Sequence, residues 1–334
     1  MFNTTKSTVP GVHVKKAKRH FLVTSENQLV GVLQVDPINL EMLSESHQSA
    51  IHEIYRELLD ELTYPIEIHS TQRRRSLKEY REWLIGQKSS ERRHKKSYLN
   101  YCRNLEKRGI TTTTHYIVVR VDIRRENCVR ELISRLKRIK QALSTDEFAV
   151  RGVTGKELER LGRRFGRRKL LAYKDHIRLP LRTGSDYRKT VYVHEFPANI
   201  GLGWVAEILR VNGLVDITQA IEPVDTTKAT KQLDYLRKKS QTELNIGHPE
   251  DYRGVNKLES VSDDVEWFLD LLADRECTAV SYGAYITVHG RSWKRVERAF
   301  EQVLTLLRSL RIDYRVPVFR SDLAYSADSP LAVD

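Results

Sequence analysis

Hydrophobic residues in the first half of the chain change repeatedly between strand-like and helix-like spacing. Runs rich in β-branched residues predict strands, and these occupy residues 21–23, 29–35, 66–69, 114–121 and 147–150. Apolar residues three and four positions apart predict helices, at 51–62, 77–84, 98–105 and 129–143. Ser44 and Ser46 suit the start of the first helix, because a serine hydroxyl accepts a hydrogen bond from an unpaired helix N–H. The polar stretch 88–96 leaves two interpretations of 77–105 open, one long helix or a broken helical hairpin.

The second half repeats this alternation. It predicts strands at 190–194, 215–221, 278–282, 285–289 and 314–319, and helices at 204–209, 229–244, 261–272 and 293–310. Residues 116–151 match residues 285–318 in kind, each a strand, a polar turn, an amphipathic helix of about five turns and a short strand. The pattern predicts an α+β fold with two subdomains of βαβ (ferredoxin-like or split-βαβ) character plus additional helices.

Glycine, proline and charge divide the chain further. Residues 162–188 combine Gly162, Gly166, Pro180 and Gly184 with many charged side chains, which favours a linker, although LAYKDHIRLPL within it allows a short strand. The expected organisation therefore has five parts: a basic N-terminal segment (1–19), a basic α+β subdomain (20–161), a basic linker (162–188), a second α+β subdomain (189–320) and an irregular C-terminal tail (321–334).

The net charge of +13 is concentrated in the first half. Residues 1–190 contain 40 Lys and Arg against 22 Asp and Glu, whereas the remaining residues contain 17 against 22. A positive field attracts the phosphates of nucleic acid or of an anionic membrane surface. Besides the run at 15–20, the densest basic runs supply the candidate contact residues Arg73, Arg74, Arg75, Arg92, Arg93, Lys95, Lys96, Arg163, Arg164, Arg167, Arg168 and Lys169.

Motifs for catalysis and metal binding are not found. The Gly155-Lys156 pair is the nearest approach to a phosphate-binding loop, but Val150 replaces its first glycine and Glu157 replaces the Ser or Thr that would hold magnesium. The chain contains no His-x-His triplet of the kind that nicking enzymes use, and His52-Glu53 lacks the second histidine of a zinc-protease motif. We therefore expect no catalytic residue, no metal site and no cofactor.

Other features indicate a protein that stays inside the cell. No apolar run approaches the roughly 20 residues of a membrane-spanning helix, and no apolar stretch follows the basic N-terminal residues as in a secretion signal. The three cysteines are far apart in the sequence, so neither disulfides nor structural zinc are expected. Trp204 and Trp293 fall on apolar helix stripes and are predicted to be packing or interface residues.

Several stretches resemble the N-terminal region of the VirB/TrbE/CagE family of conjugative transfer ATPases, the energising subunits of type IV secretion systems. They include LVGVLQVDPINLEMLSESHQSAIHEIYRELLDELTYPIEIHSTQRRRSLKEYREWL, THYIVVRVD and VHEFPANIGLGWVAEIL. VDITQAIEPVDTTKATKQLDYL and AYITVHGRSWKRVERAFEQVLTLL continue the likeness. It covers roughly residues 20–330 and rests on the order of elements. The family's RecA-like motor is not part of it, which leaves open a motor-less relative or an N-terminal piece.

The resemblance implies a docking function in a conjugative DNA-transfer machine. Its implied partners are transfer-channel subunits, a separate or missing ATPase motor, and further copies of the chain in a homo-oligomer. The resemblance and the basic first half together predict a cytoplasmic protein located peripherally at the inner face of the cell membrane. A plasmid- or virus-encoded nucleic-acid-binding protein is the alternative, since it needs only the same basic residues.

Overall fold

The computed structural model describes residues 14–38, 42–87, 92–144, 149–165, 171–181, 183–197, 200–201, 203–246, 252–274, 277–321 and 323–324. Mixed α+β structure, predicted from the alternating periodicities, is confirmed. The strands are β1 (Val14–Ala17), β2 (Leu22–Thr24), β3 (Gln28–Val35), β4 (Ile66–Arg74), β5 (Thr111–Asp122), β6 (Val150–Gly152), β7 (Leu171–Ala172), β8 (Ile177–Pro180), β9 (Ser185–Glu195), β10 (Leu214–Pro223), β11 (Val280–Gly290) and β12 (Asp313–Arg315). The helices are α1 (Glu45–Asp60), α2 (Lys78–Gly86), α3 (Arg92–Arg108), α4 (Cys128–Leu143), α5 (Gly155–Phe165), α6 (Trp204–Leu209), α7 (Thr226–Ile246), α8 (Tyr252–Ala273) and α9 (Trp293–Ser309).

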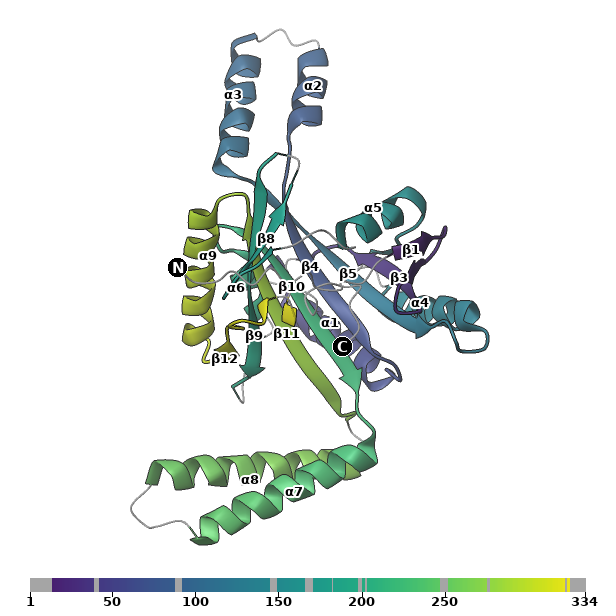
Figure 1. Cartoon of the computed structure of the whole chain (residues 1–334), viewed down its shortest axis with the longest axis vertical. Helices are drawn as coiled ribbons and strands as arrows, with labels where there is room; N and C mark the ends of the chain where they lie inside the picture. The colour runs from purple at the N-terminus through teal and green to yellow at the C-terminus, as the bar shows by residue number, and fades with distance from the viewer. Residues whose placement is uncertain are drawn as a thin grey trace.

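All described strands belong to one antiparallel sheet (Figure 1). Its order is β1-β2-β3-β5-β4-β10-β11-β9-β8-β7, with β6 beside β3 and β12 beside β9. Two units of the same topology can be traced in it. The first unit comprises β3, α1, β4, β5, α4 and β6, in the spatial order β6-β3-β5-β4, and the second unit comprises β9, α6, β10, β11, α9 and β12, in the order β12-β9-β11-β10. Each order is that of a ferredoxin-like split βαβ fold.

The two units meet edge to edge through β4 and β10. These strands pair antiparallel, with Ile66 opposite Ile221 and Thr71 opposite Asp216. The sheet therefore runs without interruption from one unit to the other. The sequence repeat corresponds to β5-α4-β6 and β11-α9-β12, which are equivalent parts of the two units.

Each unit buries the apolar stripe of its helices against one face of the sheet. In the first unit Leu132 and Ile139 of α4 pack with Val119 of β5, and in the second unit Phe300 of α9 packs with Ile286 of β11. Side chains at neighbouring strand positions point to opposite faces. Val118 is also buried and belongs to another cluster with Leu158 of α5, so α5 covers the opposite face of the first unit.

A helical hairpin is inserted at the same place in each unit. Helices α2 and α3 lie between β4 and β5, in residues 75–110, and helices α7 and α8 lie between β10 and β11, in residues 224–279. Each insertion follows the C-terminal end of its strand, and β4 and β10 are antiparallel. The hairpins consequently project from opposite ends of the sheet (Figure 1). For residues 77–105 the hairpin, and not one long helix, is the correct interpretation.

Some expected elements differ from those observed. The strands expected at 278–282 and 285–289 form one strand, β11, and the strand expected at 314–319 is limited to β12. Helix α5 and strands β1, β7 and β8 were not predicted as separate elements, and residues 162–188 include the end of α5, both short strands and the first residues of β9. The division into domains itself stays a prediction. The expected cap of α1 is confirmed, because the Ser44 hydroxyl accepts a hydrogen bond from the His47 N–H.

Candidate polyanion-binding surfaces

The basic runs at 73–75 and 92–96 belong to one structural feature, the α2–α3 hairpin. Arg73 and Arg74 end β4, and the Arg75 N–H donates to the Ile110 carbonyl at 2.8 Å, which closes the base of the hairpin. The side chains of Arg73, Arg74 and Arg75 are exposed. The insertion between β4 and β5, residues 75–110, contains eleven Lys and Arg against four Asp and Glu. We call this insertion the basic hairpin.

The predicted residues of α3 have different structural roles. Lys95 is partly buried, and its ammonium group donates at 2.7 Å to the carbonyls of Ile85 and Gln87, at the C-terminal end of α2. Cations at this position satisfy carbonyls that have no partner within the helix. Arg93 and Lys96 are exposed, and within the described residues neither forms an ion pair. Arg92 is described only as part of the α3 backbone.

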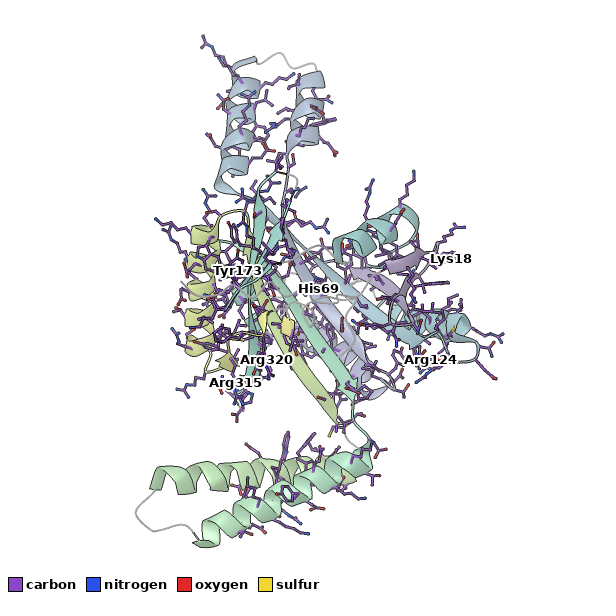
Figure 2. All side chains as sticks on the ribbon, in the orientation of Figure 1. Lys18, His69, Arg124, Tyr173, Arg315 and Arg320 are labelled. Atoms are coloured by element: carbon purple, nitrogen blue, oxygen red, sulfur yellow. The ribbon has the colours of Figure 1, made fainter. Side chains whose placement is uncertain are left out.

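The basic run at 15–20 lies beside helix α5 at the edge of the sheet. Helix α5 packs against β1, and the Gly155 N–H donates to the Arg19 carbonyl at 2.8 Å. This contact brings the run at 15–20 close to α5, although more than a hundred residues separate them in the sequence. Figure 2 labels Lys18 at this edge. The exposed cations of the edge patch, as we call it, are Lys15, Lys16, Lys18, Arg19, Lys156 and Arg160.

Only the first residues of the basic run at 163–169 are described. Arg163 and Arg164 belong to the last turns of α5, where only their backbone is described. Arg167, Arg168 and Lys169 lie outside the described residues. A charged edge strand such as β1 also resists pairing with another sheet, so its lysines have a structural effect besides any binding role.

The Gly155-Lys156 pair does not form a phosphate-binding loop. Only residues 153 and 154 separate β6 from α5, which is too short a connection to wrap around a phosphate. Glu157 occupies the first turn of α5, and both of its carboxylate oxygens accept from Arg151, at 2.7 and 2.8 Å. Hydrogen bonding from Arg151 holds the pKa of Glu157 below its usual value. A charged carboxylate thus occupies the helix end that would otherwise attract a phosphate.

The two predicted packing tryptophans belong to the second unit. Trp204 is buried at the start of α6, with its ring edge-on to Phe196 at 5.4 Å between centroids. Trp293 is partly buried at the start of α9, and its ring lies 4.1 Å from His176 and 5.9 Å from Tyr187. It therefore holds the β7–β8 turn against α9.

A row of buried polar side chains, which was not predicted from the sequence, crosses the centre of the sheet. His69 of β4 lies 2.7 Å from the Thr218 hydroxyl of β10 (Figure 2 labels His69). The Thr71 hydroxyl donates to Asp216 at 2.7 Å, and His289 of β11 lies 3.3 Å from the other oxygen of Asp216. Polar residues at every second position of 67–71 are the sequence signal for this row. It contains no serine or cysteine nucleophile, and its hydrogen bonds connect the two units.

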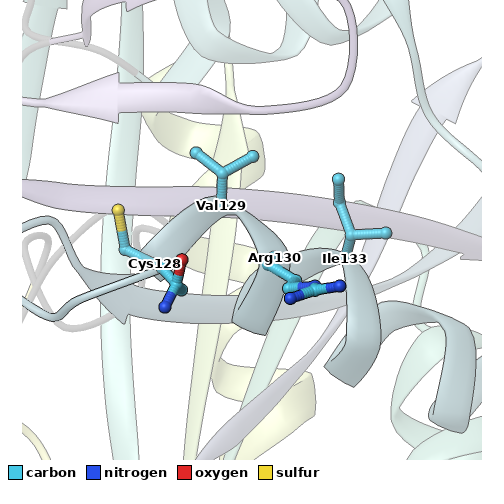
Figure 3. A pocket seen from close by; sticks show the side chains of 5 residues that line it. Cys128, Val129, Arg130 and Ile133 are labelled. Carbon is cyan, nitrogen blue, oxygen red and sulfur yellow. The ribbon is translucent and has the colours of Figure 1, made fainter.

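A shallow depression lies at the start of α4. It is lined by Asn127, Cys128, Val129, Arg130 and Ile133 (Figure 3). Because this lining has one charged side chain and neither carboxylate nor histidine, it offers no acid–base pair for catalysis.

Metal sites and membrane-spanning helices are not found in the described residues. No group of three or more His, Cys, Asp or Glu side chains there is arranged to hold a metal ion. No described helix is long and apolar enough to cross a membrane. The cysteines Cys102, Cys128 and Cys277 are free thiols.

The structure defines a tandem of ferredoxin-like units with two basic surfaces. Residues 15–166, a little under half of the chain, match the family model of the archaeal TraC-like domain. This family is related to conjugative transfer ATPases. The match covers the first unit, the basic hairpin and all six cations of the edge patch. No curated protein matched the chain.

Proposed function

We propose that the chain is a non-catalytic docking and assembly module of a conjugative DNA-transfer machine, acting at the cytoplasmic face of the membrane with a separate ATPase motor. The TraC-like match of residues 15–166 supports the conjugative setting. The likeness to the N-terminal region of the VirB/TrbE/CagE proteins favours docking within a type IV secretion system. The occupied N-terminus of α5 supports the non-catalytic part, since Glu157 and Arg151 pair where a phosphate would bind.

The observation that carries the proposal is the edge patch. Its six cations come from two segments that α5 and β1 bring together, so the fold itself concentrates positive charge. Basic residues near an anionic bilayer each contribute about 1 kcal/mol of attraction. Several of them acting together can hold a protein at the membrane surface without any inserted helix.

Vesicle flotation tests this surface. We expect the chain to float with vesicles that contain about one third phosphatidylglycerol and to remain behind with purely zwitterionic vesicles, because the attraction is electrostatic. The variant Lys15→Glu/Lys16→Glu/Arg160→Glu should lose most of this binding. Its matched control reverses three exposed cations of the second unit, Arg291, Lys294 and Arg298. Equal binding by the edge-patch variant and the wild type would contradict the membrane role.

Nucleic-acid binding is the second candidate, and the basic hairpin supports it. Tyr80, Trp83, Tyr98 and Tyr101 are exposed on this hairpin among its cations. Exposed aromatic rings beside positive charge suit the stacking of unpaired bases. Titration of a fluorescent single-stranded oligonucleotide at several salt concentrations separates the two functions. Tight binding that weakens steeply with salt and survives the edge-patch substitutions would favour the nucleic-acid candidate.

A further inference from the structure

The two inserted hairpins both expose aromatic side chains on unpartnered helix faces. On the basic hairpin, Tyr80 stacks on Trp83 at 5.6 Å and meets Tyr98 edge-on at 6.3 Å, and Tyr98 lies 6.0 Å from Tyr101. These four rings form a continuous strip along both helices. Between 40% and 56% of each residue is exposed. Tyr98 and Tyr101 contact other rings of the strip, and no helix in the described part of the chain covers them.

Helix α8 of the α7–α8 hairpin exposes an aromatic side chain on a surface of opposite charge. Trp267 of α8 is 65% exposed. Tyr235 of α7 is also exposed, but it lies among the exposed cations Lys231, Lys238 and Lys239 and does not belong to this surface. Residues three, four and seven positions apart share a helix face. Asp263, Asp264, Asp270 and Asp274 therefore surround Trp267, and all four are exposed.

The charge difference extends to the whole insertions. Residues 224–279 contain eight Lys and Arg against twelve Asp and Glu, compared with eleven against four in the basic hairpin. We call this second insertion the acidic hairpin. Asp263, Asp264, Asp270 and Asp274 form no ion pair within the described residues, and neither do Arg93 and Lys96 of the basic hairpin. Each surface thus has unneutralised charge that suits the other.

Geometry prevents the two hairpins of one molecule from meeting. They leave opposite ends of the sheet, because they follow antiparallel strands (Figure 1). Helix α8, with 22 residues, extends about 33 Å, and the α7–α8 hairpin lies beyond the end of the sheet opposite to the basic hairpin (Figure 1). Complementary surfaces at opposite ends of a molecule connect different copies head to tail.

We infer that the chain associates with itself head to tail, the basic hairpin of one copy docking on the acidic hairpin of the next. This inference refines the assembly part of the proposed function by naming a second copy of the chain as one partner. The aromatic strip meets Trp267, and the cations of α3 meet the carboxylates of α8. Because such a contact is heterologous, it produces a closed ring or an open filament according to the rotation between neighbours.

Charge reversal tests the inference on the full chain. Sedimentation velocity between 1 and 200 µM at low salt should show species larger than a monomer, whose fraction falls as salt rises. The basic-hairpin variant Arg93→Glu/Lys96→Glu should weaken association about tenfold or more, and so should the acidic-hairpin variant Asp263→Lys/Asp264→Lys/Asp270→Lys. Trp267→Ala should weaken it as well, since an exposed aromatic residue at the centre of an interface contributes strongly.

Combining the variants decides the orientation of the contact. An equimolar mixture of the two charge-reversed variants should associate again, because each retains the surface that the other has lost. A single chain with both reversals should also associate, since its charges are exchanged and remain complementary. A wild type that is monomeric over the whole range would overturn the inference. So would an absence of rescue in the mixture, which would indicate a symmetric contact or a different partner.

The vesicle experiment is independent of this one. Both charge-reversed hairpin variants should retain binding to anionic vesicles, because the edge patch is unchanged in them. If the chain binds vesicles but does not self-associate, only the head-to-tail contact is disproved. If it self-associates but does not bind vesicles, only the membrane role is disproved.

Discussion

Asp216 of β10 is predicted to contribute strongly to the stability of the contact between the two units. It is 1% exposed, and one of its carboxylate oxygens accepts from the Thr71 hydroxyl at 2.7 Å and from the Gln72 N–H at 3.2 Å, both in β4. Replacing Asp216 with alanine deprives two buried donors of this acceptor. Each such loss costs about 1–3 kcal/mol. We therefore expect Asp216→Ala to lower the free energy of unfolding by about 4 kcal/mol, a large part of the 5–15 kcal/mol of a typical domain.

Urea denaturation followed by circular dichroism and tryptophan fluorescence measures this loss. Asp216→Asn keeps an acceptor oxygen for both donors, so it should cost clearly less than Asp216→Ala. A double-mutant cycle with Thr71→Val should give a coupling energy of about 1–2 kcal/mol, because the two side chains share one hydrogen bond. The reasoning is refuted if Asp216→Ala costs less than about 1 kcal/mol, or if the cycle shows no coupling.

Two other stability predictions follow from particular contacts. Gly213→Ala would place its Cβ 2.7 Å from the Cβ of Ala299 on α9, and this overpacking should lower the free energy of unfolding by about 1–3 kcal/mol, measured by thermal unfolding. Gly152→Ala is the control, because its Cβ would have no neighbour within 4 Å. Equal losses of stability in the two variants would contradict the explanation. Burial lowers the pKa of His115, whose ring lies 2.7 Å from the Ser70 hydroxyl. As the pH falls below about 6.5, this histidine is therefore protonated in the unfolded chain before it is protonated in the folded chain. The folded state should lose stability over that pH range. His115→Gln should lose less stability over the same pH range, and an identical pH dependence of the variant would exclude His115 as the cause.

The sequence predicted the regular parts of the fold because their patterns are local. Helix α4 has an apolar stripe and a polar face, and β3 and β5 are continuous apolar runs, as expected of strands covered on both faces. Helix α5 was missed because only Leu158 and Leu161 mark its buried face, in a segment otherwise rich in charge and glycine. The pairing of β4 with β10 depends on contacts about 150 residues apart, and no local pattern specifies it.

The residues of the candidate surfaces could be predicted from the sequence, but their arrangement in space could not. The basic runs were evident in the sequence, whereas the meeting of Lys15 and Lys16 with α5 depends on the fold. Lys95 was grouped with the exposed cations, yet it binds the C-terminal end of α2, because the hairpin geometry brings that end within reach. The exposure of Trp267 was not evident either, because Trp267 lies next to the apolar positions 265 and 268 of the predicted helix.

The joining of both units in one polypeptide has a consequence for how their surfaces can differ. Two identical subunits that shared a sheet across β4 and β10 would carry the same inserted hairpin at both ends. The hairpins of neighbouring dimers would then have the same charge and would repel each other. A tandem chain is free of this restriction, because each copy of the motif is encoded separately and changes by itself. A tandem of two such units can therefore be a polar molecule with distinguishable ends, which a head-to-tail contact between copies requires.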